Sequence, residues 1–335
     1  MVGRSIRSFP IPLTPMRLAT IDIGTNTAQL LVAERDGTKL RRLHTAERFV
    51  RLGEGVDARG RIGREAQGRL LDALRDHLQE ARTYDVDRVS AAGTSALRDA
   101  ANRDAVLASV RDALGLSVDL LSGTEEATWS FAAARAAFDD LSGECLVVDV
   151  GGGSTELIAG AAPGQTRSSP AEAIRDHASL DVGCVRLTER CFASQPPSPN
   201  AVETAEQVID EALAARTLAV GDAPVLIGTA GTATALALVH AGPASTWDAL
   251  HGNGFVLSRE DVRDWRERLL GRSVDGILEL HPEAMAGRAD VFPMGVILLD
   301  RILAHYDLDD LRVSPYELRH GLALRLLASA PASPS

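Results

Sequence analysis

The chain has 335 residues, a length typical of about two domains, and 45% of them are hydrophobic. No apolar run approaches the ~20 residues of a transmembrane helix, so the composition favours a soluble globular protein without a membrane partner. The net charge of −11 argues against a general binder of duplex nucleic acid, which needs a basic face. Lys39 is the only lysine, which excludes a Walker-A nucleotide site because that site needs a lysine after its glycine loop.

The two ends of the chain carry no targeting pattern. Residues 1–15 contain Arg4, Arg7 and three prolines but no continuous apolar stretch, so they do not make a signal peptide. We expect residues 1–15 to be a disordered extension or, alternatively, the result of a mis-assigned start. We also expect the Ala/Pro/Ser-rich residues 328–335 to be a disordered tail and the protein to be cytoplasmic. The three scattered cysteines fit neither a disulfide framework nor a zinc site, and the apolar run around Cys145 indicates a core position.

The first half of the chain alternates predicted strands with predicted helices. Residues 18–23 and 29–34 indicate a hairpin of two strands around a Gly-Thr-Asn-Thr turn at 24–27. Leucines on one face predict a helix over 64–82. The further elements expected here are strands at 86–92 and 117–121 and helices from 96, at 106–114 and at 122–138.

The second half repeats this alternation. Residues 145–149 and 155–160 are expected to pair around a second glycine loop, and 225–238 reads as a third strand, loop and helix. Surface loops are expected at 162–170 and 194–200, and the last helices at 258–270, 294–306 and 317–327. Strands alternating with helices predict an α/β protein.

One short cassette occurs twice. Residues 22–31 and 149–158 align without a gap, and Gln29 stands where Glu156 stands. The repeat predicts two domains related by duplication, 16–138 and 139–327, with the last helix able to pack back on the first domain. Two similar loops suggest two jaws around one phosphate ligand, the first jaw being residues 22–31 and the second residues 149–158. A carboxylate at this position in only one jaw suggests an asymmetric, catalytic arrangement.

Glycine clusters bounded by Ser and Thr let backbone N–H groups and hydroxyls approach phosphate oxygens closely. A tight turn explains any one such loop better than phosphate binding does, but three loops in one chain, two of them in matched cassettes, favour phosphate binding. Arginines can extend this lining, because a guanidinium clamps phosphate with a planar fork. The candidate phosphate-binding residues are Gly24, Thr25, Asn26, Thr27, Gly152, Gly153, Ser154, Thr155, Gly228, Gly231, Thr232, Arg98 and Arg288, with Arg48, Arg51 and Arg186 as further arginines.

Four carboxylates are placed next to these loops. Asp22 and Asp149 each end an apolar strand before a glycine loop, where an aspartate either holds Mg²⁺ through waters or caps the loop. Glu126 and Glu156 are the candidate bases, because hydrolysis of a phosphoanhydride needs an oriented and partly deprotonated water. Glu126 could instead serve only the dipole of its helix, and Glu125 is its immediate competitor.

Taken in order, these motifs resemble the exopolyphosphatase / guanosine pentaphosphate phosphohydrolase (Ppx/GppA) family. The matching strings are IDIGTNT (21–27), GTSALR (93–98), SGTEEA (122–127), VDVGGGSTEL (148–157), GTAGT (228–232) and RADV (288–291). The resemblance implies an actin-like ATPase (ribonuclease H-like) fold with two duplicated α/β domains flanking a cleft. It also implies attack of water on the terminal phosphate of inorganic polyphosphate or of pppGpp, with Mg²⁺ or alternatively Mn²⁺ as cofactor.

The same resemblance assigns roles by motif position. Glu126 and Glu156 orient and activate water, Asp149 supports the metal, Arg98 contacts phosphate, and the glycine loops bind the chain. Asp22 stays a metal candidate by its position before the first loop alone. The sequence departs from the family pattern near its C-terminus, where Pro315-Tyr316-Glu317 follows Val-Ser and puts in doubt a ligand role for that turn. The chain also ends where longer members continue into further helical domains, so three outcomes are expected to be open: a preference for short chains, a preference for a nucleotide, or a homodimer that completes the substrate channel.

Several functions remain compatible with the residues. The leading expectation is an exopolyphosphatase, and the runner-up is a pppGpp 5′-phosphohydrolase that uses the same site. An actin-like kinase or ATPase would need an acceptor site that nothing in the sequence marks. A non-catalytic sensor of polyphosphate or alarmone would tolerate loss of the carboxylates, and retention of Glu126 and Glu156 argues against it.

Overall fold

The computed structural model describes residues 16–36, 39–138, 140–161, 170–221, 224–246 and 255–329. The expected extension at 1–15, residues 330–335 of the expected tail and most of the expected loop at 162–170 lie outside the described residues. None of the described helices is both long enough and apolar enough to cross a membrane.

The first sheet has five strands and contains the first copy of the cassette. Its order is β3 (Lys39–Phe49), β2 (Thr27–Asp36), β1 (Arg17–Ile23), β4 (Arg88–Gly93) and β5 (Val118–Leu120). The hairpin of β1 and β2 is antiparallel, as expected, whereas β4 and β5 run parallel to β1. The edge strand β3 was not predicted, because its charged sequence shows no clear alternation.

The second sheet has six strands and contains the second copy. Its order is β10 (Phe255–Ser258), β11 (Asp310–Val313), β9 (Val225–Thr229), β6 (Glu144–Val150), β7 (Thr155–Ala161) and β8 (Ile174–Leu180). The run from β8 to β11 repeats the order and the strand directions of the first sheet, so the duplication expected from the cassettes extends to the sheet topology.

The register of the two hairpins is also the same. Asp22 lies opposite Gln29 across β1 and β2, and Asp149 lies opposite Glu156 across β6 and β7. Each loop is closed by one backbone bond, from Gly24 N to the carbonyl of Thr27 at 2.9 Å and from the corresponding Gly151 N to the carbonyl of Ser154 at 3.0 Å. The two jaws are therefore equivalent in backbone geometry and differ in their side chains.

Four helices accompany the first sheet. They are α1 (Val56–Arg59), α2 (Arg64–Arg82), α3 (Ser95–Asp99) and α4 (Arg103–Leu114), and the bounds of α2 agree with the prediction. The buried side of α2 includes Leu70 and Leu74, which join a hydrophobic cluster with the inner face of the sheet. This leucine face is the one that the helical spacing predicted.

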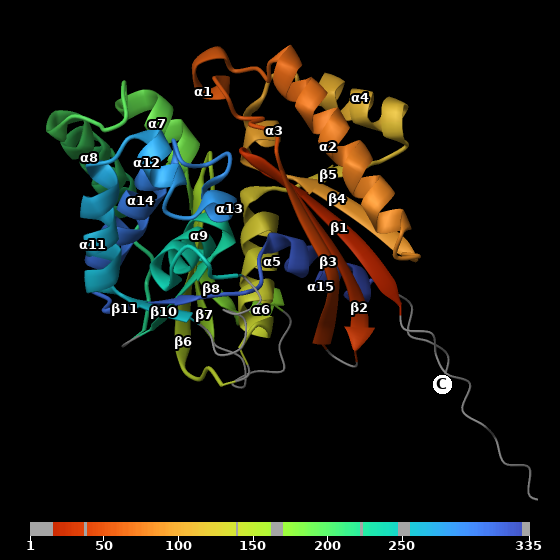
Figure 1. Ribbon diagram of the computed structural model, residues 1–335. Coiled ribbons are helices and arrows are strands. Elements are labelled where there is room, and N and C mark those ends of the chain that lie inside the picture. The colour runs from red at the N-terminus through yellow and green to blue at the C-terminus, as the bar shows by residue number, and fades with distance from the viewer. Residues whose placement is uncertain are drawn as a thin grey trace, which may run out of the picture.

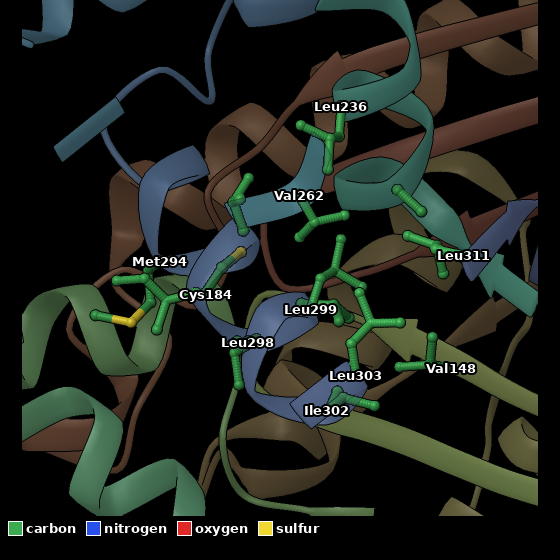
Figure 2. Close-up of a cluster of buried hydrophobic side chains, with 14 of the residues drawn as sticks. Val148, Cys184, Leu236, Val262, Met294, Leu298, Leu299, Ile302, Leu303 and Leu311 are labelled. Carbon is green, nitrogen blue, oxygen red and sulfur yellow. The ribbon is translucent and has the colours of Figure 1, made fainter. Parts of the chain in front are cut away.

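The helices of the second half surround the second sheet. They are α6 (Pro170–Ala173), α7 (Cys184–Cys191), α8 (Pro199–Ala215), α9 (Ala230–Ala241), α11 (Arg259–Leu270), α12 (Val274–Leu278), α13 (Pro282–Met285) and α14 (Phe292–His305). Figure 2 shows side chains of α14, among them Leu299 and Leu303, packed against Val148 of β6 and Leu311 of β11. Cys145 is also a core residue, as expected, with 1% of its surface exposed.

Five of the second-half helices were not predicted from the sequence: α6, α7, α8, α12 and α13. The loop expected at 194–200 gives way to α8 at Pro199, because Ser198 caps the helix by accepting a hydrogen bond from Ala201 N and proline suits the first helical turn. Helix α7 follows β8 after a short turn that ends at Gly183, a glycine that the sequence analysis did not use as a helix start.

Two helices lie between the sheets, α5 (Gly123–Ala136) and α15 (Leu318–Ala328), as Figure 1 shows. Helix α5 packs on the second sheet, where Phe131 and Ala127 join a cluster with Val147. Helix α15 packs on the first sheet and also contacts α5, where a Cβ on Gly321 would overlap the backbone of Trp129. The two halves of the chain thus exchange one helix each and enclose a cleft, which is the actin-like arrangement.

Candidate active site

A cavity of about 100 Å³ lies where the glycine loops of the two sheets face each other. Most of the residues expected from the sequence to bind phosphate or metal line it. These are Asp22, Gly24, Thr25, Asn26, Thr27, Glu126, Asp149, Gly152, Ser154, Gly231, Thr232 and Arg288.

The two jaws touch at Thr25 and Gly152. A Cβ on Gly152 would lie 2.9 Å from Cβ of Thr25, a separation that only glycine at this position avoids. The hydroxyl of Thr25 is 2.8 Å from that of Ser95, at the start of α3, and Ser95 also lines the cavity. Hydroxyls and glycine N–H groups from both sheets therefore converge on one small space, which suits a phosphate group.

Four carboxylates line the cavity: Asp22, Glu126, Asp149 and Glu317. Glu126 is 6% exposed and Glu317 4%. Burial, and then the charge of Glu126, raises the pKa of Asp149 to about 7. The same two causes hold the pKa of Asp22 well above its usual range. Like charges this close favour a bound cation or proton, so the inner end of the cavity is suited to a positively charged ligand.

Arg98, which the sequence predicted to contact phosphate, pairs with Glu126 in the structure. Its Nη1 donates to Glu126 Oε2 at 2.8 Å and to the carbonyl of Leu121 at 3.1 Å. Burial raises the pKa of Glu126, while the hydrogen bond from Arg98 opposes that rise. Arg98 does not itself line the cavity, so in this structure it positions Glu126.

Glu156 lies behind the wall of the cavity. Its Oε1 accepts hydrogen bonds from Ser154 at 2.7 Å and from Ser179 at 2.8 Å, and only 1% of its surface is exposed. Burial, and then the charge of Glu126, raises the pKa of Glu156 well above its usual range. Ser154 lines the cavity, so Glu156 reaches the cavity through this hydroxyl.

The donor set fits a hydrated divalent cation. In the part of the chain that the structure describes, no three His, Cys, Asp or Glu side chains are grouped to hold a metal ion directly. Mg²⁺ does not need such a cage, because it commonly keeps several waters and binds through one or two carboxylates and substrate phosphates. Asp22 Oδ1 is buried and accepts no hydrogen bond, and Asp149 is its charged neighbour, so these two aspartates fit that mode of binding.

Arginines span the mouth of the cleft. Arg288 donates to the carbonyl of Gly231 at 3.0 Å and pairs with Glu47 of β3, on the opposite sheet. Arg51 forms a two-pronged pair with Asp290, at 2.8 and 3.0 Å. These contacts join the first sheet to the segment before α14, and they place the guanidinium of Arg288 on the cavity wall.

Other expected residues lie outside the cavity wall. Arg48 pairs with Glu80, and Arg186 pairs with Asp57 and Asp99. Five candidates lie near the cavity but not on its lining: Arg98, Gly153, Thr155, Glu156 and Gly228.

The structure also adds residues that the sequence did not single out. Ser130 donates to Asp149 Oδ2 at 3.3 Å, and Ser95 and Ser179 act as described above. Glu317 stands at the start of α15, in the turn whose ligand role the sequence put in doubt, and it lines the cavity. The departure of this turn from the family pattern was the only signal for Glu317, and the sequence carried no signal for Ser130 in α5 or Ser179 in β8.

Comparison with known proteins agrees with this geometry. The sequence matches the Ppx/GppA phosphatase family over residues 31–330. It is 36% identical to exopolyphosphatase 2 of Mycobacterium tuberculosis, covering 92% of this chain and 98% of that one. It is 29% identical to the guanosine-5′-triphosphate,3′-diphosphate pyrophosphatase of Vibrio atlanticus, covering 94% of this chain and 60% of that one.

Among solved structures, an exopolyphosphatase from Cytophaga hutchinsonii superposes with a TM-score of 0.80 and 27% identity. The superposition covers 94% of this chain and 99% of that one. The expected actin-like fold and the expected hydrolysis of phosphoanhydride bonds are thereby confirmed. This chain belongs to the Ppx/GppA phosphatase family.

Proposed function

We propose that the protein is an exopolyphosphatase, which hydrolyses the terminal phosphoanhydride of inorganic polyphosphate and releases orthophosphate. The observation that carries the proposal is the contact of the two phosphate loops at Thr25 and Gly152 around a cavity that Glu126 also lines. The 36% identity to a protein named exopolyphosphatase 2 supports polyphosphate as the substrate.

In this proposal the glycine loops and Arg288 hold the terminal phosphate by N–H groups and a guanidinium. Glu126 orients the attacking water, and Glu156 receives its proton through Ser154, which separates Glu156 from the cavity. Asp22 and Asp149 would hold a divalent cation, Mg²⁺ by preference and Mn²⁺ as the alternative. When bound, such a cation neutralises charge on the phosphate oxygens in the transition state.

A specific observation also supports the second candidate, pppGpp 5′-phosphohydrolase. A cavity of about 370 Å³ adjoins the first one, and Arg288 and Glu317 line both. Its wall carries Phe49, Thr45 and Thr234, so it offers an aromatic face and hydroxyls next to the phosphate site. The guanine and ribose of pppGpp suit this aromatic and hydroxyl-bearing wall, and Arg288 and Arg319 on the same wall suit its 3′-diphosphate.

The organisation of the chain is part of the proposal. We assign the first domain to 16–138 and the second to 139–327, with α15 returning to the first sheet and α5 packing on the second. We also propose a homodimer, in which a second copy would extend the substrate channel beyond this cleft, and a cytoplasmic location.

Phosphate release from a panel of substrates tests the function. The protein is incubated with Mg²⁺ and long polyphosphate, tripolyphosphate, pppGpp or ATP, and the Glu126→Gln variant serves as the control for contaminating phosphatases. We expect the fastest release from polyphosphate, and none above the control from ATP. Release from pppGpp with none from polyphosphate would replace the first candidate by the second.

A further inference from the structure

Ser179 links the buried carboxylate to the outer surface of the protein. It lies directly opposite Glu156 in the pairing of β7 with β8, which brings its hydroxyl to 2.8 Å from Glu156 Oε1. Ser179 is nevertheless exposed, whereas Glu156 is 1% exposed. A single serine thus touches both the buried glutamate and solvent.

The solvent that Ser179 meets is not that of the catalytic cavity. Ser179 lines an open groove of about 360 Å³ together with Gly123, Thr124, His177 and Arg216, and none of these residues lines the catalytic cavity. The groove is also narrow at α5, since a Cβ on Gly123 would lie 3.2 Å from Cβ of Ser179. Glu156 therefore lies between two separate openings, with Ser154 on one side and Ser179 on the other.

The hydroxyls of Ser154 and Ser179 both donate a hydrogen bond to the same oxygen of Glu156. Ser154 lies 2.7 Å and Ser179 2.8 Å from Oε1, so cavity, Ser154, Glu156, Ser179 and groove form a continuous line of hydrogen-bonding groups. A hydroxyl can accept one proton while it donates another, which makes such a line able to carry a proton without moving heavy atoms.

We propose that Ser179 is a positioning residue that completes a proton exit from Glu156 to the outer groove. The water oxygen bonds to the terminal phosphorus as the bridging P–O bond breaks, and the leaving oxygen departs with the shortened chain. One water proton passes to Ser154 as the Ser154 proton moves to Glu156. Protonated Glu156 then gives its proton to Ser179, whose own proton goes to water in the groove, and the carboxylate is restored. This proposal rests on the role given to Glu156 above.

A buried base such as Glu156 needs a second hydrogen-bonding partner, besides Ser154, through which it can lose the proton that it has accepted. Glu156 cannot release a proton directly to solvent, and return through Ser154 is blocked while phosphate occupies the cavity. The exposed hydroxyl of Ser179 provides the alternative, because it lies in a groove that shares no lining residue with the cavity.

The test uses the full-length protein and the Ser179→Ala variant, with polyphosphate as substrate. We expect kcat to fall about 10-fold with KM within about two-fold, since Ser179 touches no substrate. We also expect the dependence of single-turnover rate on D₂O fraction to change from a curve, typical of several protons in flight, to a straight line. Thr124→Val is the matched control: it removes a hydroxyl from the same groove that bonds His177 rather than Glu156, and it should leave both measurements unchanged.

A double-mutant cycle separates this proposal from the proposed function. If Ser179 acts through Glu156, Ser179→Ala should have no further effect in the Glu156→Gln background. Equal losses in both backgrounds, or wild-type kcat in Ser179→Ala, would overturn the proton exit while leaving Glu156 as a base. Wild-type kcat in Glu156→Gln would instead overturn the role of Glu156 in the proposed function.

Discussion

Gln29 and Glu156 occupy the same position in the two duplicated hairpins, each directly opposite the aspartate that ends the first strand. The third strand continues both rows: Glu47 lies opposite Gln29, and Ser179 lies opposite Glu156. In the first sheet the carboxylate of this row is therefore Glu47, on the edge strand β3 instead of on β2. Glu47 pairs with Arg288 across the cleft. The duplication has kept the pairing of the strands and redistributed the charge, and we propose that this difference leaves one jaw to bind phosphate while the other also carries a catalytic carboxylate.

Arg98 should control the ionisation of Glu126. Replacing it with methionine in Arg98→Met removes the cation that opposes the burial of Glu126, so the pKa of Glu126 should rise further. We expect the acid limb of the kcat/KM profile to move to higher pH and activity at neutral pH to fall by about 10–100-fold. Arg111→Met, at an exposed arginine of α4 that is ion-paired only with Asp112, is the control. An unmoved acid limb would show that Arg98 acts in another way.

Asp149 should make the protein less stable as the pH rises. Its pKa is about 7 in the folded state and about 4 in an unfolded chain, so its burial costs nothing below about pH 4 and the cost is complete above about pH 7. Asp149→Asn removes that cost, and at pH 8 it should raise the free energy of unfolding by up to about 4 kcal/mol, with little change at pH 4. Urea unfolding at both pH values, without divalent cations, measures the difference.

Two controls complete that measurement. Asp140→Asn changes an exposed aspartate whose pKa is lowered by Arg312, so it should show no gain at pH 8. Adding Mg²⁺ should stabilise the wild type more than Asp149→Asn, because the aspartate is one of the proposed holders of the cation. An equal effect of Mg²⁺ on both proteins would argue against that role.

An added methyl group at Gly152, where the two jaws touch, should lower activity. Gly152→Ala brings a Cβ to 2.9 Å from Thr25, which must shift one loop against the other. We expect kcat/KM to fall by on the order of 10², because misplacement by about 1 Å has this effect in positioned sites, while Tm changes little. Gly68→Ala in α2, where no atom lies within 4 Å of the new Cβ, should leave activity unchanged and raise stability by about 1 kcal/mol. Full activity in Gly152→Ala would show that the loops adjust freely.

The sequence predicted those elements and site residues that short motifs mark. It did not predict site residues whose position depends on how strands or helices far apart in the chain pair and pack. The hairpins, the bounds of α2 and the cluster of Asp22, Glu126 and Asp149 followed from motifs and spacing. Ser179 could not be found, because its partner Glu156 is fixed by the pairing of β7 with β8 and lies 23 residues away. Glu317 reaches the cavity only because α15 returns to the first sheet.

The most direct test of the proposed bases compares three variants, in each of which one glutamate is replaced by glutamine. Glu126→Gln and Glu156→Gln remove the two proposed bases, and Glu125→Gln changes the exposed neighbour of Glu126, which bonds Ser122 at the start of α5. Each variant is mixed with polyphosphate and Mg²⁺, and phosphate release is followed under saturating substrate. We expect kcat to fall by on the order of 10²–10⁴ in the first two variants and to stay near the wild-type value in Glu125→Gln, with all three folded. Near-wild-type turnover in both Glu126→Gln and Glu156→Gln would contradict a site in which these carboxylates activate water.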